Sequence, residues 1–239
     1  ATDMKSGLVA LMFTMIVCQI KKLIRRGEII FVATFGEEAC SLGAKHIVEN
    51  GYLKKYDAMI IGEPTHNELV VAHKGALWVE VKSVGKTAHG SMPNKGTNAI
   101  EGLIAYLNEV RKEKIINSSD PLVSESTIAL TRISGGNNFN VIPDCCKATL
   151  DLRTLPKQNH QEILTKLNRL AHDMSTKLNN FPKVTIQCVN NLSALETDKG
   201  SEIVQHTQSV LRGMNKQDSL RGMNYYTDGS TFGKAFGGD

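Results

Sequence analysis

The segment Leu77-Trp78-Val79-Glu80-Val81-Lys82 alternates apolar and polar residues. This alternation is typical of a β-strand with one buried and one solvated face. Working outward from it, the sequence predicts a strand, a helix, two strands, a helix and a strand at residues 77–82, 98–112, 127–133, 147–153, 158–178 and 184–189. That order is the split βαβ arrangement of ferredoxin-like domains. We therefore expect residues 74–192 to form a self-contained α+β domain.

The sequence on either side of this domain follows a different pattern. It predicts a helix, a buried strand, a short helix and a second buried strand at residues 8–26, 29–35, 42–50 and 57–62. A strand, a helix and a strand in that spacing imply a parallel pair joined by a right-handed crossover. Beyond residue 193 the only clear element is a helix over 201–212. The expected fold class is α/β, with an incomplete catalytic domain of residues 1–73 and 193–239 that carries the ferredoxin-like insertion.

Composition excludes several classes of protein. Lys plus Arg number 28 and Asp plus Glu 24, and this mild excess of +4 argues against a nucleic-acid partner. The longest apolar stretch, Leu8–Ile20, reaches only about 20 Å as a helix, short of the roughly 30 Å of a bilayer core, so no membrane association is expected. Five cysteines without CxxC spacing favour a reducing, cytoplasmic location. The sequence does not begin with Met, and we expect a fragment of a longer protein.

Carboxylates follow both predicted strands of the α/β domain. Glu37 and Glu38 come after the first strand and Glu63 after the second, and Asp3 precedes the first helix. Ligands of open α/β sheets bind beyond the carboxyl ends of the strands, and like charges crowded there raise one another's pKa. No Lys or Arg immediately flanks these glutamates, which favours a divalent metal as the neutralising group. The alternative is structural: a Glu pair suits a helix start, and Glu-Pro suits a turn.

Six motifs occur in a characteristic order: Ala1–Gly7, Gly36–Glu38, Gly62–Thr65, His73–Gly75, Thr87–Pro93 and Asn140–Pro143. Together they resemble the dinuclear zinc amidohydrolases and exopeptidases of the acetylornithine deacetylase and succinyl-diaminopimelate desuccinylase family. The resemblance covers residues 1–190 and is strongest to the desuccinylases. Each motif alone is weak, and the signal lies in their number and order.

The resemblance implies a role for each matching residue of the α/β domain. Asp3 matches the carboxylate that bridges two zinc ions, and Glu38 and Glu63 match terminal ligands of one metal each. Glu37 matches the general base. Two divalent ions are therefore the implied cofactors, zinc first, with cobalt or manganese also possible.

The resemblance also implies a homodimer formed through the inserted domain. His89 matches a histidine that reaches into the partner's site and stabilises the tetrahedral oxyanion, although a solvated loop histidine is the simpler interpretation of it. Asn140 and Arg153 match residues that hold substrate, and a guanidinium suits a substrate carboxylate; Arg153 could equally be a surface charge. The implied reaction is hydrolysis of the N-acyl bond of a small acylated amino acid, with N-succinyl-diaminopimelate expected.

Departures from the family pattern weaken this expectation for the chain by itself. Two histidine ligands of the family have no counterpart, and Tyr225 and Tyr226 stand where glycines are expected before Thr227-Asp228-Gly229. If these 239 residues were the whole molecule, we would expect weak metal binding and little activity. Acetylornithine deacetylase or dipeptidase activity, and a non-catalytic dimerising module, are the alternatives. A repeated pentapeptide, Leu211–Asn215 and Leu220–Asn224, has no functional interpretation.

Overall fold

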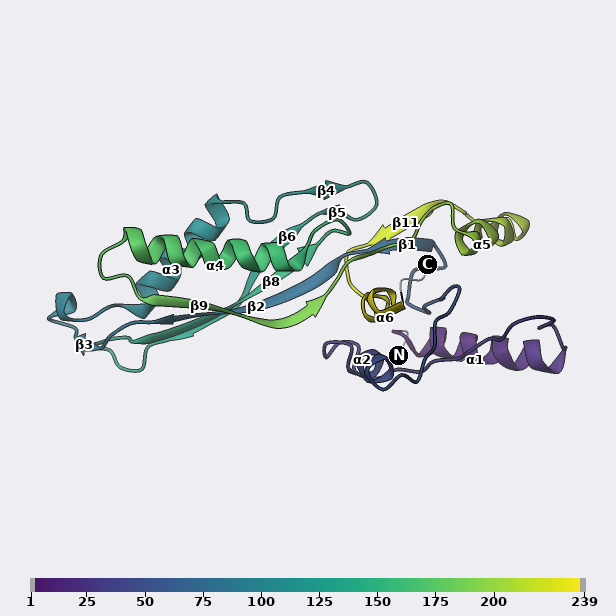
Figure 1. Cartoon of the computed structure of the whole chain (residues 1–239), viewed down its shortest axis with the longest axis horizontal. Coiled ribbons are helices and arrows are strands. Elements are labelled where there is room, and N and C mark those ends of the chain that lie inside the picture. The colour runs from purple at the N-terminus through teal and green to yellow at the C-terminus, as the bar shows by residue number, and fades with distance from the viewer. Residues whose placement is uncertain (1–2, 237–239) are drawn as a thin grey trace. The chain divides into compact units, whose positions relative to one another are not determined.

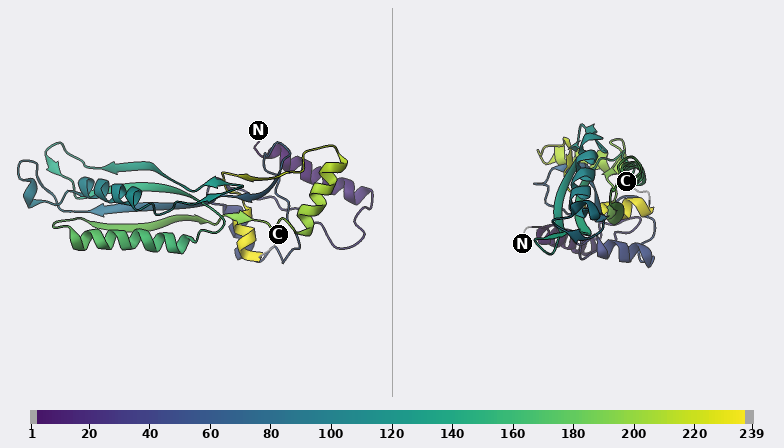
Figure 2. Two further views of the ribbon diagram at one scale, coloured as in Figure 1. Left: turned by 90° about the horizontal axis from the view of Figure 1, so that it is seen from above. Right: turned by 90° about the vertical axis from the view of Figure 1, so that its left-hand side faces the viewer.

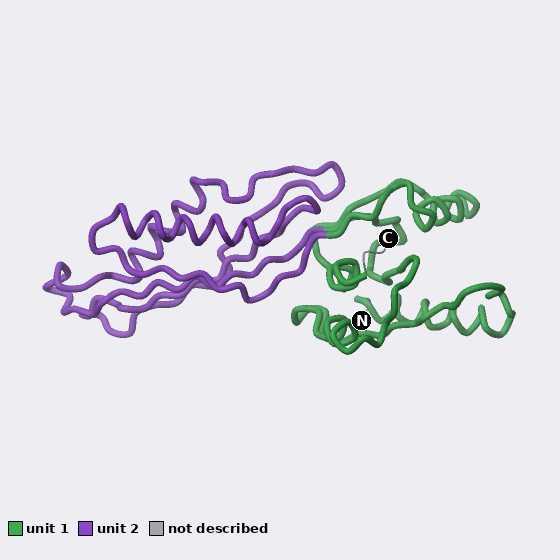
Figure 3. The backbone as a smooth tube through the Cα atoms, in the orientation of Figure 1, with its two compact units in different colours: residues 1–73, 195–239 green, residues 74–194 purple. Residues whose placement is uncertain are grey.

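The chain forms two compact units in the computed structural model, which describes residues 3–236 (Figure 1). One unit contains Ala1–His73 and Leu195–Asp239, and the other contains Lys74–Ala194 (Figure 3). The sequence placed these boundaries after residues 73 and 192. The first motif's Ala1 and Thr2 lie outside the described residues.

The unit Lys74–Ala194 has the predicted ferredoxin-like fold. Its four-stranded antiparallel sheet has the order β6-β8-β2-β9, formed by Thr127–Gly135, Cys145–Thr154, Gly75–Val84 and Lys183–Leu192. The helices α3 (Ala99–Lys112) and α4 (His160–Lys177) lie side by side along the sheet (Figure 2). Each predicted element is present, and each strand is longer than predicted because residues that flank the predicted run also pair in the ladder.

The alternating pattern of β2 separates the two faces of this sheet. Leu77, Val79 and Val81 are fully buried and pack against the helices, so Trp78 and Glu80 point to the opposite face. The two helices are joined through Tyr106, whose hydroxyl donates to the Leu167 carbonyl at 3.0 Å. Asparagine side chains cap both helices, Asn98 at α3 and Asn159 at α4, which satisfies backbone N–H groups that the helices leave unpaired.

Smaller elements decorate the two ends of this sheet. They are β3 (Ala88–His89), a 3-10 turn η1 (Pro93–Lys95), β4 (Ser119–Asp120), β5 (Ser124–Glu125) and β7 (Val141–Ile142). β3 pairs with β7 and β4 pairs with β5, both antiparallel. β3 comes shortly after the end of β2 at Val84, and its partner β7 comes shortly before the start of β8 at Cys145. β4 and β5 both precede β6.

The other unit is built on a three-stranded sheet of order β10-β1-β11. Its elements are α1 (Lys5–Ile20), α2 (Leu42–Glu49), β1 (Leu69–His73), β10 (Leu195–Glu196), α5 (Glu202–Gly213), β11 (Leu220–Met223) and α6 (Gly229–Phe236). β11 runs parallel to β1. A small core forms where α2 meets α6, around Ala44, Leu53 and Phe232. The two copies of the repeated pentapeptide differ in structure, since the first spans the end of α5 and the second forms β11.

Two strand predictions in this unit are wrong. Within the described residues, neither 29–35 nor 57–62 is a strand, and the predicted parallel crossover is not formed. Ile29, Phe35 and Ile60 are 48%, 67% and 65% exposed. An apolar run becomes a buried strand only where neighbouring strands pair its backbone groups and cover its side chains, and neither condition is met here.

Other expectations for this unit need correction as well. The first helix ends at Ile20 instead of residue 26, and none of its residues is buried. β1, β11 and α6 were not predicted, because each is short and takes its partners from distant parts of the chain. No helix within residues 3–236 combines the length and the apolar character needed to cross a membrane. None of the five cysteines, all of which lie in this range, forms a disulfide.

Candidate functional site

Four of the predicted acidic residues lie in the unit that contains both chain ends, at the ends of its elements. Glu37 and Glu38 lie in the turn between Gly36 and α2, and Gly36 adopts a positive φ of 65° there, a conformation that glycine reaches without steric cost. Glu63 follows the extended segment 57–62, and Asp3 directly precedes α1. Asp3 and Glu38 are exposed, whereas Glu37 and Glu63 are partly buried.

The partly buried pair has strongly shifted acidity. Burial, followed by the negative charges of Glu63, Asp228, Glu38 and Asp3, raises the pKa of Glu37 to about 7. Burial, followed by the charges of Asp3, Asp228 and Glu38, raises the pKa of Glu63 to about 7 as well. All of the charges that act on these two side chains are carboxylates. Five acidic groups therefore share one electrostatic environment.

Two glycines bring Asp3 and Glu63 into this environment. α1 approaches the extended segment backbone to backbone at Gly7, where an added Cβ would lie 1.9 Å from the Gly62 carbonyl oxygen. Gly62 in turn lies against Met4 and Leu11. Because both residues lack a side chain, the start of α1 and the residue that precedes Glu63 come into direct contact.

We predict that Gly7→Ala lowers the free energy of unfolding by about 1–3 kcal/mol, since the methyl group forces α1 away from Gly62. The urea midpoint of the whole chain measures this change. Gly213→Ala is the matched control, because nothing lies within 4 Å of its Cβ position. Equal midpoints for the two variants would show that the close approach at Gly7 is not needed.

Asp228 joins the acidic cluster although it was not among the predicted site residues. Thr34 Oγ1 donates to Asp228 Oδ2 at 2.6 Å. Asp228 is 7% exposed, and its Oδ1 is buried with no hydrogen-bond partner among the described residues. The signal was present in the sequence as Thr227-Asp228-Gly229, but its distance of 165 residues from Glu63 along the chain concealed the contact.

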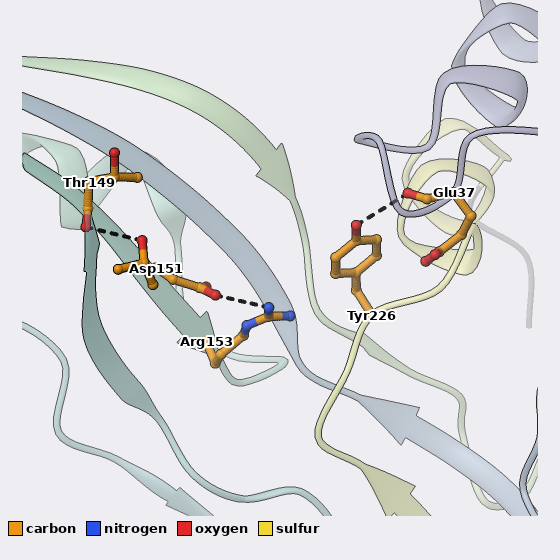
Figure 4. Close-up of polar contacts among 6 residues, drawn as sticks. Glu37, Thr149, Asp151, Arg153 and Tyr226 are labelled. Carbon is orange, nitrogen blue, oxygen red and sulfur yellow. Dashed lines mark hydrogen bonds and ion pairs between the residues drawn. The ribbon is translucent and has the colours of Figure 1, made fainter.

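Tyr226 occupies one of the positions where the family pattern has glycine. Its hydroxyl donates to the Glu37 carbonyl oxygen at 3.2 Å (Figure 4). The tyrosine is 8% exposed. It therefore ties the turn that carries Glu37 to the segment that carries Asp228.

The acidic cluster suits a divalent cation in charge and donor chemistry. The buried, unpartnered Asp228 Oδ1 is an acceptor without a donor, and carboxylate oxygen is a common ligand of zinc, manganese and magnesium. Between residues 3 and 236, however, no three His, Cys, Asp or Glu side chains lie close enough together to bind one ion. The cluster thus has the charge of a metal site without a closed coordination shell.

Arg153 lies on β8 in the ferredoxin-like unit, where it interacts with Asp151 and with the positive charge of Lys74. Its Nη2 donates to Asp151 Oδ2 at 2.9 Å (Figure 4). Lys74 donates to the Glu125 carbonyl oxygen. Burial lowers the pKa of Lys74, the Glu125 charge opposes this, and the positive charge of Arg153 lowers it further. Two cations therefore lie within electrostatic reach of each other at the start of β2.

His89 and Asn140 are brought together at the other end of the same sheet. His89 lies on β3 and Asn140 directly precedes β7, the strand that pairs with β3, and Gly90 N donates to the Asn140 carbonyl oxygen at 2.7 Å. Both residues are exposed, and His89 Nδ1 lies 2.8 Å from Ser91 Oγ. In register, Arg153 pairs with Ala76 and Cys145 pairs with Val84. The stretch of β8 from Cys145 to Arg153, about 26 Å at 3.3 Å per residue, separates Arg153 from this strand pair.

A discontinuous α/β unit with an acidic cluster, interrupted by a ferredoxin-like unit, is the architecture that the sequence motifs led us to expect. Residues 71–177 match the family described as the Peptidase dimerisation domain. The chain is 28% identical over 244 residues to a probable succinyl-diaminopimelate desuccinylase of Staphylococcus aureus, covering 92% of this chain and 60% of that protein. It is 29% identical over 186 residues to an acetylornithine deacetylase of Pasteurella multocida, covering 75% and 48%.

Solved structures agree on the fold. A tripeptidase of Staphylococcus aureus superposes with a TM-score of 0.78 at 22% identity, covering 99% of this chain and 61% of that one. An aminopeptidase of Bacillus cereus gives 0.71 at 21% identity, covering 96% and 59%. The chain spans about 60% of the length of the relatives it matches first. Residues 71–177 thus match a peptidase dimerisation domain, and the chain is similar over most of its length to the desuccinylase and the deacetylase named above.

Proposed function

We propose that this chain is part of a metal-dependent hydrolase that cleaves the N-acyl amide bond of an acylated amino acid. The observation that carries the proposal is the acidic cluster of Asp3, Glu37, Glu38, Glu63 and Asp228. Such mutual repulsion destabilises a fold unless a cation or protonation relieves it, and acids with shifted pKa values cluster at functional sites. Zinc is the proposed metal, as in the family that the motifs resemble.

We assign Asp3, Glu38 and Glu63 as the metal-holding residues, with Asp228 as an additional buried acceptor. A bound divalent ion would supply Lewis acidity and lower the pKa of water. Glu37 takes a proton from the attacking water and returns it to the leaving amine. Its placement fits this role, because Tyr226 fixes the backbone of its turn while the carboxyl group stays among the other acids.

Substrate recognition is assigned to the ferredoxin-like unit. Arg153 and Lys74 together present two positive charges, and a guanidinium binds a carboxylate through two parallel hydrogen bonds. An acyl group that ends in a carboxylate, such as succinyl, suits this pair better than acetyl does. N-succinyl-diaminopimelate is therefore the proposed substrate.

We propose that two copies act together as a homodimer, with His89 and Asn140 serving the partner's site. A small substrate held at Arg153 cannot reach His89 of the same chain, because β8 separates them by about 26 Å. In the dimer, the β3–β7 strand pair of one copy can reach the substrate of the other. The strand β6 is at the edge of the sheet, and its Leu130 and Ile133 are 37% and 52% exposed. An unpaired apolar edge favours association with a second copy.

The substrate assignment is tested by parallel hydrolysis assays with N-succinyl-diaminopimelate, N-acetylornithine and a tripeptide, with and without zinc. We expect kcat/KM for the succinyl substrate to exceed the others at least about tenfold, which corresponds to about 1.4 kcal/mol of transition-state stabilisation. Removal of the metal by a chelator should abolish all turnover. Faster hydrolysis of acetylornithine or of the tripeptide would assign that activity instead. A dimer without any zinc-dependent reaction would indicate a non-catalytic module.

Ile133→Lys is expected to convert the dimer to a monomer, because it places a charge on the exposed edge strand β6. Light scattering of the purified chain measures the mass directly. Val189→Lys on the opposite edge strand β9, 56% exposed, is the matched control. A monomeric wild-type chain, or dissociation by the control alone, would contradict the assignment of β6 as the interface.

A further inference from the structure

Three neighbouring strands carry a row of polar side chains on the face of the ferredoxin-like sheet opposite the helices. Asp151 on β8 and Asn190 on β9 are the register partners of Trp78 on β2. Side chains paired in this way across a sheet lie on one face with Cβ atoms about 5 Å apart. Asp151, Trp78 and Asn190, which we call the polar row, therefore form one local cluster.

The polar row contains four buried polar atoms that have no hydrogen-bond partner among the described residues. They are Trp78 Nε1, Asp151 Oδ1 and both side-chain amide atoms of Asn190. Asn190 itself is only 3% exposed. Buried polar atoms in folded proteins are nearly always paired, and an unpaired group calls for an explanation. Four in one row indicate a group that is bound in function.

Charges beside the polar row restrict what that group can be. The carboxylate of Asp151 uses its other oxygen to bind Arg153, and Arg153 lies within electrostatic reach of Lys74. The row thus offers a negative acceptor, an amide that donates and accepts, an indole donor and an adjacent pair of cations.

A group with both charges satisfies this set. A carboxylate alone pairs with the cations and the indole but leaves Asp151 Oδ1 without a donor. An amine alone pairs with Asp151 and the Asn190 oxygen but leaves the indole and the Asn190 NH₂ without an acceptor. An α-amino-acid group carries an ammonium and a carboxylate on one carbon and can pair with both ends of the row.

We propose that the polar row is a binding site for the free α-amino-acid group of a ligand, with the ammonium at Asp151 and the carboxylate at the Trp78 indole and the Asn190 amide, while Arg153 and Lys74 hold the acyl carboxylate. This inference rests on the proposed function and deepens it: the preferred substrate carries an unacylated amino-acid end besides the amide that is cleaved. Acylated amino acids without such an end bind less tightly. Because the polar atoms are buried, ligand entry requires a local side-chain movement.

Trp78 is the single tryptophan of the chain, so its indole N–H gives one resonance. The experiment titrates the ¹⁵N-labelled full chain with glycine, acetate or ethylamine and follows this resonance. We expect a saturable shift with glycine, half-complete on the order of 1–10 mM, and at least tenfold weaker effects with the other two. Asp151→Asn and Asn190→Ala should each weaken glycine binding at least tenfold.

Glu80→Gln is the control variant, because Glu80 lies on the same strand and face as Trp78 but pairs with Lys147 outside the row. It should bind glycine as the wild type does. A dispersed amide spectrum identifies which variants are folded, and either row variant suffices for the comparison. An indole shift as strong with acetate as with glycine, or no shift with glycine, would overturn the proposal. The titration measures binding and not turnover. Glycine binding can therefore be observed even if the hydrolysis assay fails, and a lack of glycine binding does not contradict the proposed hydrolase activity.

Discussion

Replacement of Glu37 by glutamine is expected to lower kcat by about 10²–10⁴-fold while metal affinity stays close to the wild-type value. Glutamine keeps the size of the side chain and its hydrogen-bonding reach but cannot accept a proton. The backbone contact with Tyr226 uses the Glu37 carbonyl and is unaffected by the change. The expected loss is thus confined to proton transfer.

Steady-state kinetics and a zinc titration of the same preparation measure the two quantities separately. Glu49→Gln is the matched control, since Glu49 is an exposed residue at the end of α2, the helix that follows the Glu37 turn. It should leave both kcat and metal affinity unchanged. If Glu37→Gln instead removed metal binding together with activity, Glu37 would be a ligand and another group would be the base.

Without metal, the chain is expected to lose stability as the pH rises from about 4.5 to 7. Glu37 and Glu63 have pKa values raised to about 7 in the folded chain, against 4.5 as their ordinary value. In this window the folded chain holds more protons than the unfolded chain, so the free energy of unfolding falls with increasing pH. After allowance for solvent screening of these partly exposed groups, the loss is on the order of 1–2 kcal/mol for each.

Urea unfolding at a series of pH values measures this dependence. Glu63→Gln should flatten the curve and raise stability at pH 8, because it removes a charge that repels Asp3, Asp228 and Glu38. Zinc should raise the stability of the wild type at pH 8 and that of Glu63→Gln much less, since a ligand that binds the folded state stabilises it. A wild-type chain that gains stability between pH 5 and 7 would show that the acids do not repel one another.

The ferredoxin-like unit was predictable because each of its elements has a complete local signal. The alternation in 77–82 marks one buried face, and Asn98 and Asn159 mark the helix starts as caps. Sheet and helices of this unit bury one another within a single stretch of 121 residues, so no distant segment was needed to complete it.

The acidic site was predictable only in part. Glu37, Glu38 and Glu63 stood out because they follow apolar runs, yet those runs are not strands in the described residues. Asp228 was missed because its contact with Thr34 joins residues 194 positions apart. The apolar runs signal a preference for burial, and whether a partner strand is present to satisfy it is not encoded locally.

Residue types and their spacing were enough to predict the ferredoxin-like fold, the order of its elements and the acidic residues, because each of these signals lies within a short segment. The places of Asp228 and Tyr226 beside Glu37 became apparent only from the three-dimensional fold. It also placed Arg153 and His89 at opposite ends of one sheet. The physical reason is that burial and charge coupling depend on distances in space, and these follow from how separate segments pack together.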